Sequence, residues 1–333
     1  MTVDLPTVWF VAIAVLWTGY FVLEGFDFGV GMLLPVLGRG RDADRRVVIN
    51  AIGPVWDGNE VWLITAVGAM FAAFPAWYAA TLSGFYLPVL LIIVALIGRG
   101  VAFEYRGKVD DPRWRARWDA AIVFGSAVPA FAWGLVFANI VRGVELGPDG
   151  VVRSGLLDLL HPYALVGGLA TLALFVLHGA VFLALKTDGP VRRRARTAAR
   201  ATAPVAAAAL FAFLMWTQAD HGSGTTAVLA AGAVGALLIG TAMVARRREG
   251  WAFVATAVAV AATTAVLFVA LFPAVLPSLL DPAFDLTVAN AASRPYTLTI
   301  LSWIGVVFLP LVVLYQSWSY WVFRRRVTRE HVS

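Results

Sequence analysis

The feature that most constrains this fold is a series of long apolar segments that recurs along the chain. About 20 apolar residues cross a bilayer as a helix, and backbone groups in lipid must pair internally, so a span is a helix or part of a closed barrel. The segments are continuous and rich in Ala, Leu and Val, not alternating, which favours helices. We therefore predict an all-α, polytopic integral membrane protein with nine transmembrane helices, at roughly 7–37, 50–74, 77–100, 118–141, 162–186, 200–218, 224–245, 251–276 and 297–323.

The composition supports this class. Sixty per cent of the residues are apolar and 14% are charged, and the mean hydropathy is +0.80, whereas a soluble domain is roughly half apolar and about a quarter charged. No connecting segment is long enough for a soluble domain, so we expect a single membrane domain over residues 1–333. The chain has no cysteine, which excludes disulfides, thiolate metal sites and cysteine-ligated clusters.

The distribution of positive charge predicts the orientation. Of the 26 Lys and Arg residues, 23 lie in or beside alternate loops and in the tail, and only Arg142, Arg153 and Arg294 lie in the other loops. Because positive charges collect on the cytoplasmic side, we predict the N-terminus outside and the C-terminus in the cytoplasm. The arginine run in 186–200 then lies among anionic lipid headgroups, and nucleic acid is not an expected partner.

Four acidic residues lie inside predicted spans, all in the first half of the chain. Glu24 and Asp27 belong to the first span, and Asp57 and Glu60 belong to the second. Each pair has i, i+3 spacing and so shares one helix face. An ionised carboxylate in mid-membrane costs on the order of 3 kcal/mol, so such groups usually face a bundle interior or a hydrated cavity. Two neighbouring antiparallel helices would bring the four carboxyls into one layer on the cytoplasmic half.

Two interpretations of this acidic group remain open. Burial and like charge both disfavour ionisation, so crowded carboxyls can take up and release protons near neutral pH, as a proton path requires. Alternatively, Asp57 offsets the dipole of a helix that begins near Pro54, the Gly25–Gly29 pair permits close packing, and the acids form salt bridges to Arg99 or Arg106.

Histidines are scarce. Only His178 of the four lies deep in a predicted span, and a lone membrane histidine is more often a neutral, hydrogen-bonded residue than a ligand. A six-coordinate haem needs two axial ligands, commonly His or Met. We therefore expect no haem or metal to be ligated by this chain.

Several motifs resemble subunit II of the cytochrome bd-type quinol oxidases. The likeness covers nearly the whole chain and is most specific over 20–120. It rests on GFDFGVGMLLP (25–35), RRVVINAIGPVWDGNEVWLITAVGAMFAAFPAWYA (45–79), SGFYLP (83–88), FEYRGK (103–108), RWRARWD (113–119), LFPAVLPS (271–278) and the closing SWSYWVF (317–323).

The resemblance implies a function that the spacing of the acidic residues does not reveal. Such oxidases, in the bacterial cytoplasmic membrane, pass electrons from ubiquinol or menaquinol to oxygen, make water, and draw the protons for it from the cytoplasm. The haem-bearing subunit I carries two b haems and one d haem, and subunit II forms a heterodimer with it without ligating haem. Some members hold a quinone or a lipid in a groove or carry small single-span accessory subunits. The chain would thus be part of a quinol:oxygen oxidoreductase without a complete active site of its own.

The resemblance also assigns roles to residues. The aspartate of the WDGN segment, here Asp57, is associated with a proton route toward the haems, with Trp56 and Asn59 beside it and Asp27 as a second acid. Glu24 replaces an aspartate, and Glu60 stands where glutamine can occur. Two rival functions are a proton-coupled secondary transporter and a pure scaffold for subunit I. Intramembrane acids in only one half of the chain argue against a transporter built from two repeats.

Overall fold

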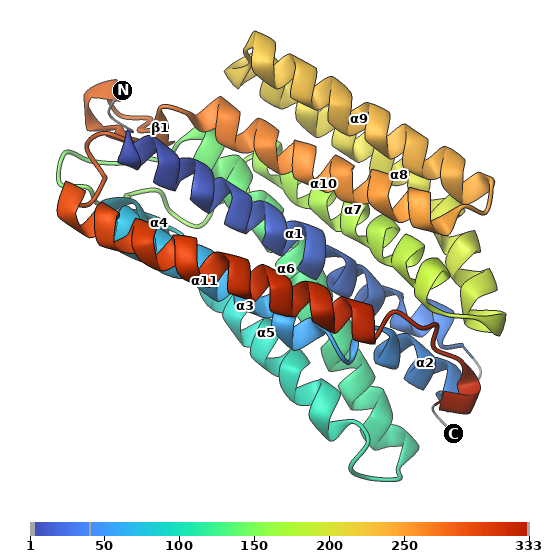
Figure 1. Cartoon of the computed structure of the whole chain (residues 1–333). Helices are drawn as coiled ribbons and strands as arrows, with labels where there is room; N and C mark the ends of the chain where they lie inside the picture. Colours follow the sequence, from blue (N-terminus) through green and yellow to red (C-terminus); the bar gives the residue numbers. More distant parts are fainter. Residues whose placement is uncertain (1–3, 40, 332–333) are drawn as a thin grey trace.

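The computed structural model describes residues 4–39 and 41–331, so the predicted domain over 1–333 extends beyond the described residues at both ends. Long helices lie side by side in one bundle (Figure 1). They are α1 (Leu5–Leu37), α2 (Asp42–Ile52), α3 (Trp56–Ala73), α4 (Pro75–Gly84), α5 (Tyr86–Tyr105), α6 (Pro112–Arg142), α7 (Pro162–Lys186), α8 (Gly189–His221), α9 (Gly224–Ala245), α10 (Glu249–Leu271) and α11 (Pro295–Val322). One small hairpin, β1 (Ala274–Leu276) with β2 (Leu286–Thr287), joins α10 to α11.

Eight of the described helices are long and apolar enough to cross a membrane, which indicates a multi-pass membrane protein. They are α1 and α5 to α11. The remaining predicted span, 50–74, corresponds to α3, which has 18 residues and carries Asp57 in its first turn. Polar residues at the start of α3 lower its hydropathy below that of the other long helices.

Several predicted boundaries differ from the structure by five residues or more, and the main differences are the following. The span 77–100 is two helices, α4 and α5, that meet at Phe85. Pro88 has no N–H to bond the Gly84 carbonyl, so a continuous helix loses a hydrogen bond at this point. Helix α8 begins 11 residues before position 200, since Asp188 accepts a bond from Gly189 N at its start and arginine is a good helix former. Helix α2, which precedes Pro54, was not predicted as a separate helix.

Helix α1 runs through the middle of the bundle and packs against α3, α6, α7 and α10. Its crossing with α7 depends on two glycines. A Cβ on Gly29 would lie 2.8 Å from the Cα of Gly179, so only glycine lets the two backbones approach this closely. Glu24 and Asp27 precede Gly29 on α1 and are fully buried in the bundle.

Helix α11 is the least buried of the long helices. Leu298 is its one residue classed as buried among those described, and its neighbours are α3 and α1. Trp9 Nε1 donates to Ser302 Oγ at 3.1 Å near one end. The rest of α11 presents apolar side chains outward, which requires lipid or an apolar partner around it.

The end of the bundle at which α7 meets α8 is rich in arginine and is called the basic end below. The segment that follows α11 holds this end together. Val327 N donates to the Lys186 carbonyl at 2.8 Å, and Asp188 N donates to the Val327 carbonyl at 3.3 Å. Lys186 Nζ donates to the carbonyls of Phe323 and Arg325. The segment therefore closes over the junction between α7 and α8.

Asp44 of α2 anchors the same closure. Its side chain is 1% exposed, and it accepts bonds from Arg329 Nε at 2.7 Å and from Arg194 Nη1 at 3.1 Å. Burial raises the pKa of the Asp44 carboxyl, but the hydrogen bonds from Arg329 and Arg194 outweigh it, so its pKa lies below the ordinary value. One carboxylate thus joins α2, α8 and the segment after α11.

We predict that Asp44→Asn loosens the basic end and destabilises the protein by about 1–2 kcal/mol, a discounted figure because both arginine partners are more than a third exposed. The pKa of Asp44 is lower in the folded state, so its ion pairs stabilise the fold above the unfolded value of about 3.9. This stabilisation is lost as the pH falls through the folded value. Thermal unfolding and trypsin cleavage after Arg324–Arg326 measure both effects.

The control for Asp44→Asn is Asp149→Asn, which breaks the exposed pair with Arg153 and should change the unfolding midpoint little. Equal midpoints for the two variants, with equal resistance to trypsin, would contradict the anchoring role.

Candidate functional site

Polar side chains from four helices meet inside the bundle. Helix α1 contributes Glu24 and Asp27, α3 contributes Asn59 and Glu60, α5 contributes Arg99, and α11 contributes Gln316 and Tyr320. Glu24, Asp27, Asn59 and Arg99 have no exposed surface. Because uncompensated charge is costly away from water, their mutual contacts decide what the group can do.

Arg99 connects two of the acids. Its Nη1 donates to Glu24 Oε1 and, at 3.2 Å, to Glu60 Oε1. The guanidinium lies 5.0 Å from the ring centre of Phe28 and 5.3 Å from that of Phe103, which adds cation–π attraction. One nitrogen of Arg99 therefore serves two carboxylates that come from different helices.

Several polar atoms of this group form no hydrogen bond with the part of the protein that the structure describes. They are Arg99 Nε and Nη2, Glu24 Oε2 and Asp27 Oδ1, all buried. Buried polar atoms in folded proteins nearly always have a partner, either protein or ordered water. These atoms are therefore suited to bind water molecules between the helices.

Asp27 is held by a second set of contacts. Asn59 Nδ2 donates to Asp27 Oδ2 at 2.6 Å, while Asn59 Oδ1 accepts from Gln316 Nε2 at 2.8 Å and from Tyr320 OH at 2.9 Å. Two donors on the oxygen side determine which way the amide points. Helix α11 thus keeps the NH₂ group of Asn59 directed at Asp27.

The structure does not bring the four predicted carboxyls together. Glu24 and Glu60 meet at Arg99, Asp27 is bound by Asn59 of α3, and Asp57 is exposed in the first turn of α3. Among the described residues, no hydrogen bond or ion pair engages its carboxylate. The neighbouring Gly53 and Pro54 are exposed too, because α3 has only just begun at this level of the bundle.

Parts of the alternative interpretation agree with this geometry. Asp57 does occupy a first helical turn, and Arg99 does pair with Glu24 and Glu60. Arg106 does not join the group, since it bonds Asp119 at 2.5 Å and Asp42 at 2.7 Å.

Trp56, the remaining predicted residue, is partly buried and packs against the ring of Phe103 at 5.0 Å. Sequence reasoning missed Gln316 and Tyr320. The available signal was their i, i+4 spacing as polar groups on a largely apolar helix, which places both on one face.

His178 forms two hydrogen bonds, as the sequence indicated. Its Nδ1 lies 2.7 Å from Thr256 Oγ1, and its Nε2 lies 3.1 Å from the Val22 carbonyl. The ring stacks on Phe253 at 4.8 Å. With both ring nitrogens occupied, His178 does not fit as an axial haem ligand. No group of three or more His, Asp or Glu residues in the described part of the chain is arranged to hold a metal ion.

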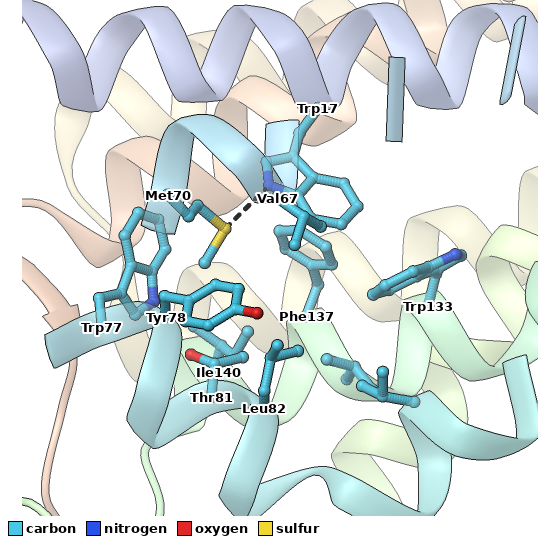
Figure 2. Close-up of a pocket in the computed structure, with 12 residues that line it drawn as sticks. Trp17, Val67, Met70, Trp77, Tyr78, Thr81, Leu82, Trp133, Phe137 and Ile140 are labelled. Atoms are coloured by element: carbon cyan, nitrogen blue, oxygen red, sulfur yellow. Dashed lines mark hydrogen bonds between the residues drawn. The ribbon is translucent and has the colours of Figure 1, made fainter. Parts of the chain in front are cut away.

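A small cavity lies elsewhere, among α1, α3, α4, α5 and α6. Figure 2 shows Trp17, Trp77, Trp133 and Phe137 around it, with Trp17 Nε1 bonded to Met70 Sδ at 3.4 Å. Its volume is about 20 Å³, which is room for one water molecule. It is too small for haem and has no acidic side chain in its lining.

Comparisons with known proteins agree over nearly the full length. Residues 5–323 match the family described as cytochrome bd terminal oxidase subunit II. The chain is 43% identical to cytochrome bd ubiquinol oxidase subunit 2 of Bacillus subtilis, over 98% of both chains. It is 35% identical to cytochrome bd-I ubiquinol oxidase subunit 2 of Escherichia coli K12, over 98% of this chain and 96% of that one.

A solved structure shares the fold. The bd oxidase from Geobacillus thermodenitrificans contains a chain that aligns with a TM-score of 0.78 at 20% identity, covering 97% of this chain and 99% of that one. On the family match and the two full-length relatives together, this chain belongs to the cytochrome bd terminal oxidase subunit II family.

Proposed function

We propose that this chain is the haem-free subunit of a quinol:oxygen oxidoreductase and that its buried acidic group conducts protons from the cytoplasm toward the haem-bearing subunit. Family membership supports the first part, since relatives are named as subunits of ubiquinol oxidases. The observation that carries the second part is the joining of Glu24 and Glu60 through Arg99, with Asp27 alongside.

Burial of the acids increases along the proposed route. Asp57 is exposed near the basic end, the Glu60 side chain is 22% exposed, and Glu24 is fully buried. Asp57 would accept a proton from water, and Glu60 would pass it inward. The unpartnered atoms of Glu24, Asp27 and Arg99 would hold the intervening waters. A path of this kind needs alternating carboxyls and water.

Charge balance favours proton uptake in this group. Glu24, Asp27 and Glu60 carry three negative charges when ionised, against one positive charge on Arg99. Excess negative charge in a low-dielectric interior favours the binding of a proton. With Arg99 present the fully ionised group has a net charge of −2, so two protons, instead of three, would neutralise it.

The proposed topology has nine crossings, with α3 as the second, the N-terminus outside and the basic end in the cytoplasm. The loops that carry 23 of the 26 Lys and Arg residues support this orientation, and α3 packs alongside α1 like a spanning helix. Protons for oxygen reduction would then enter from the side on which Asp57 lies. We propose one membrane domain in the bacterial cytoplasmic membrane.

The cofactors of the proposed complex are two b haems and one d haem, all ligated by subunit I, which agrees with the occupied nitrogens of His178. The exposed apolar face of α11 is available to a partner subunit, to a lipid or to a quinone. Quinol reaches the complex from the membrane pool, and small single-span subunits complete the proposed assembly. A pure scaffold is the second candidate, because the Arg99 ion pairs also hold α1, α3 and α5 together.

Asp57→Asn separates the conduit from the scaffold. We expect the complex to assemble with an unchanged haem spectrum, because Asp57 makes no contact that the fold needs. Oxygen uptake should fall by about 100-fold, the lower end of what one proton-transferring side chain contributes. Spectra and oxygen consumption of the purified complex measure the two effects.

The matched control for Asp57→Asn is Glu104→Gln, an exposed acid near the basic end of α5 that lies outside the acidic group. Full oxygen uptake by Asp57→Asn, or an equal loss in Glu104→Gln, would defeat the conduit hypothesis.

Arg99→Met should impair assembly, because it leaves Glu24 buried without its cation. Breaking a buried pair in this way costs about 3–5 kcal/mol. We expect a lower yield of haem-containing complex, with partial recovery when Glu24→Gln and Glu60→Gln are added. A wild-type yield from Arg99→Met alone would mean that the ion pairs do not stabilise the bundle. The control is Arg153→Met, at an exposed position.

The double variant Gln316→Leu/Tyr320→Phe removes both donors to Asn59 Oδ1 and allows the amide to turn away from Asp27. Each lost hydrogen bond costs about 1 kcal/mol, so assembly should persist while oxygen uptake declines and its pH profile shifts. Tyr315→Phe, one residue away and 65% exposed, is the control. An unchanged pH profile in the double variant would show that the orientation of Asn59 is irrelevant to proton transfer.

A further inference from the structure

The arginines of α8 do not form a uniform positive surface. Arg192 and Arg196 donate to Glu249 at 3.3 Å and 2.5 Å, and Arg194 is bound to Asp44. These three cations are therefore used to join α8 to α10 and to α2. Arg193 and Arg200 are exposed and have no carboxylate partner among the described residues.

The turn between α9 and α10 adds three more exposed cations beside Arg200. Arg200 Nη2 donates to the Ala245 carbonyl at 3.4 Å, which places it at the end of α9. Arg246, Arg247 and Arg248 follow directly and are all exposed. Within the described part of the chain, no ion pair or side-chain hydrogen bond engages these three arginines. Four neighbouring guanidinium groups thus lack a counter-charge.

An apolar surface lies directly below these charges. Trp251, in the first turn of α10, is 66% exposed, a position typical of a ring at the headgroup layer. Farther along, Val205, Leu238, Ile239 and Val254 are all more than half exposed. This arrangement matches a phospholipid, because the arginines can contact the phosphate and the apolar side chains can contact the acyl chains.

The position of α9 indicates that lipid covers this surface. Helix α9 packs against α8 and α10, and it lies on the opposite side of the bundle from α5 and α11 (Figure 1). The surface is therefore remote from the acidic group and from the α11 face. The surface thus combines exposed positive charges with exposed apolar side chains.

We propose that Arg200 and the Arg246–Arg248 turn form a binding site for an anionic phospholipid, with its phosphate among the guanidinium groups, Trp251 at the glycerol level and its acyl chains along α9 and α10. Arginine suits this role because its planar fork pairs with phosphate oxygens in a bidentate manner. The site does not depend on the proposed proton path.

The test compares Arg246→Gln/Arg248→Gln with the wild type in the intact, purified complex. Arg247 is left in place because its φ of 60° lies in the left-handed region. Native mass spectrometry during titration with phosphatidylglycerol or phosphatidylcholine measures lipid affinity. Each arginine near an anionic surface contributes about 1 kcal/mol, so phosphatidylglycerol affinity should fall about 30-fold while phosphatidylcholine affinity stays constant.

Two further variants keep the test decisive. Arg246→Lys/Arg248→Lys retains the charge and should keep most of the affinity. Arg113→Gln/Arg117→Gln removes two exposed arginines from the start of α6, which have no ion pair among the described residues, and should leave the tightest phosphatidylglycerol site intact. Unchanged affinity in Arg246→Gln/Arg248→Gln, an equal loss in the Arg113/Arg117 control, or a parallel loss for phosphatidylcholine would overturn the proposal.

Discussion

The structure depends on how one buried cation is shared between two acids. Arg99 lies in a bundle that offers it no bulk water, and its charge is offset by Glu24 on α1 and Glu60 on α3. Removing Arg99 leaves two carboxylates without a cation where solvation is poor. The same contact that holds three helices in register therefore also concentrates protonatable groups at one level of the bundle.

Sequence patterns predicted most of the fold because lipid imposes few alternatives on a long apolar segment. The bounds of α7 and α9 agree with prediction because clear signals mark them, such as Pro162 at the start of α7 and the Ser223–Thr226 capping box of α9. The error at α4 and α5 came from counting apolar residues across Phe85, where a missing backbone donor at Pro88 interrupts the helix. Hydropathy does not register such a break.

The candidate site was predictable only in part. The i, i+3 spacing placed Glu24 with Asp27, and Glu60 with Asp57, on shared faces, yet it could not tell which end of α3 would be covered by neighbours. Neighbouring helices leave the first turn of α3 uncovered, so Asp57 is exposed. Gln316 lies 257 residues from Asn59 in the sequence, and no local pattern reports a contact at that separation. Only the arrangement of α11 against α3 reveals it.

The contact between α11 and Asn59 has a consequence for how the protein is made. Every other long helix described is synthesised before α11, so during translation the amide of Asn59 emerges and inserts without either of its two donors. Until α11 leaves the ribosome and docks, Asp27 faces an amide free to rotate, and the acidic group is unfinished. The hydrogen bonds that orient Asn59 therefore form only at the last step of biogenesis.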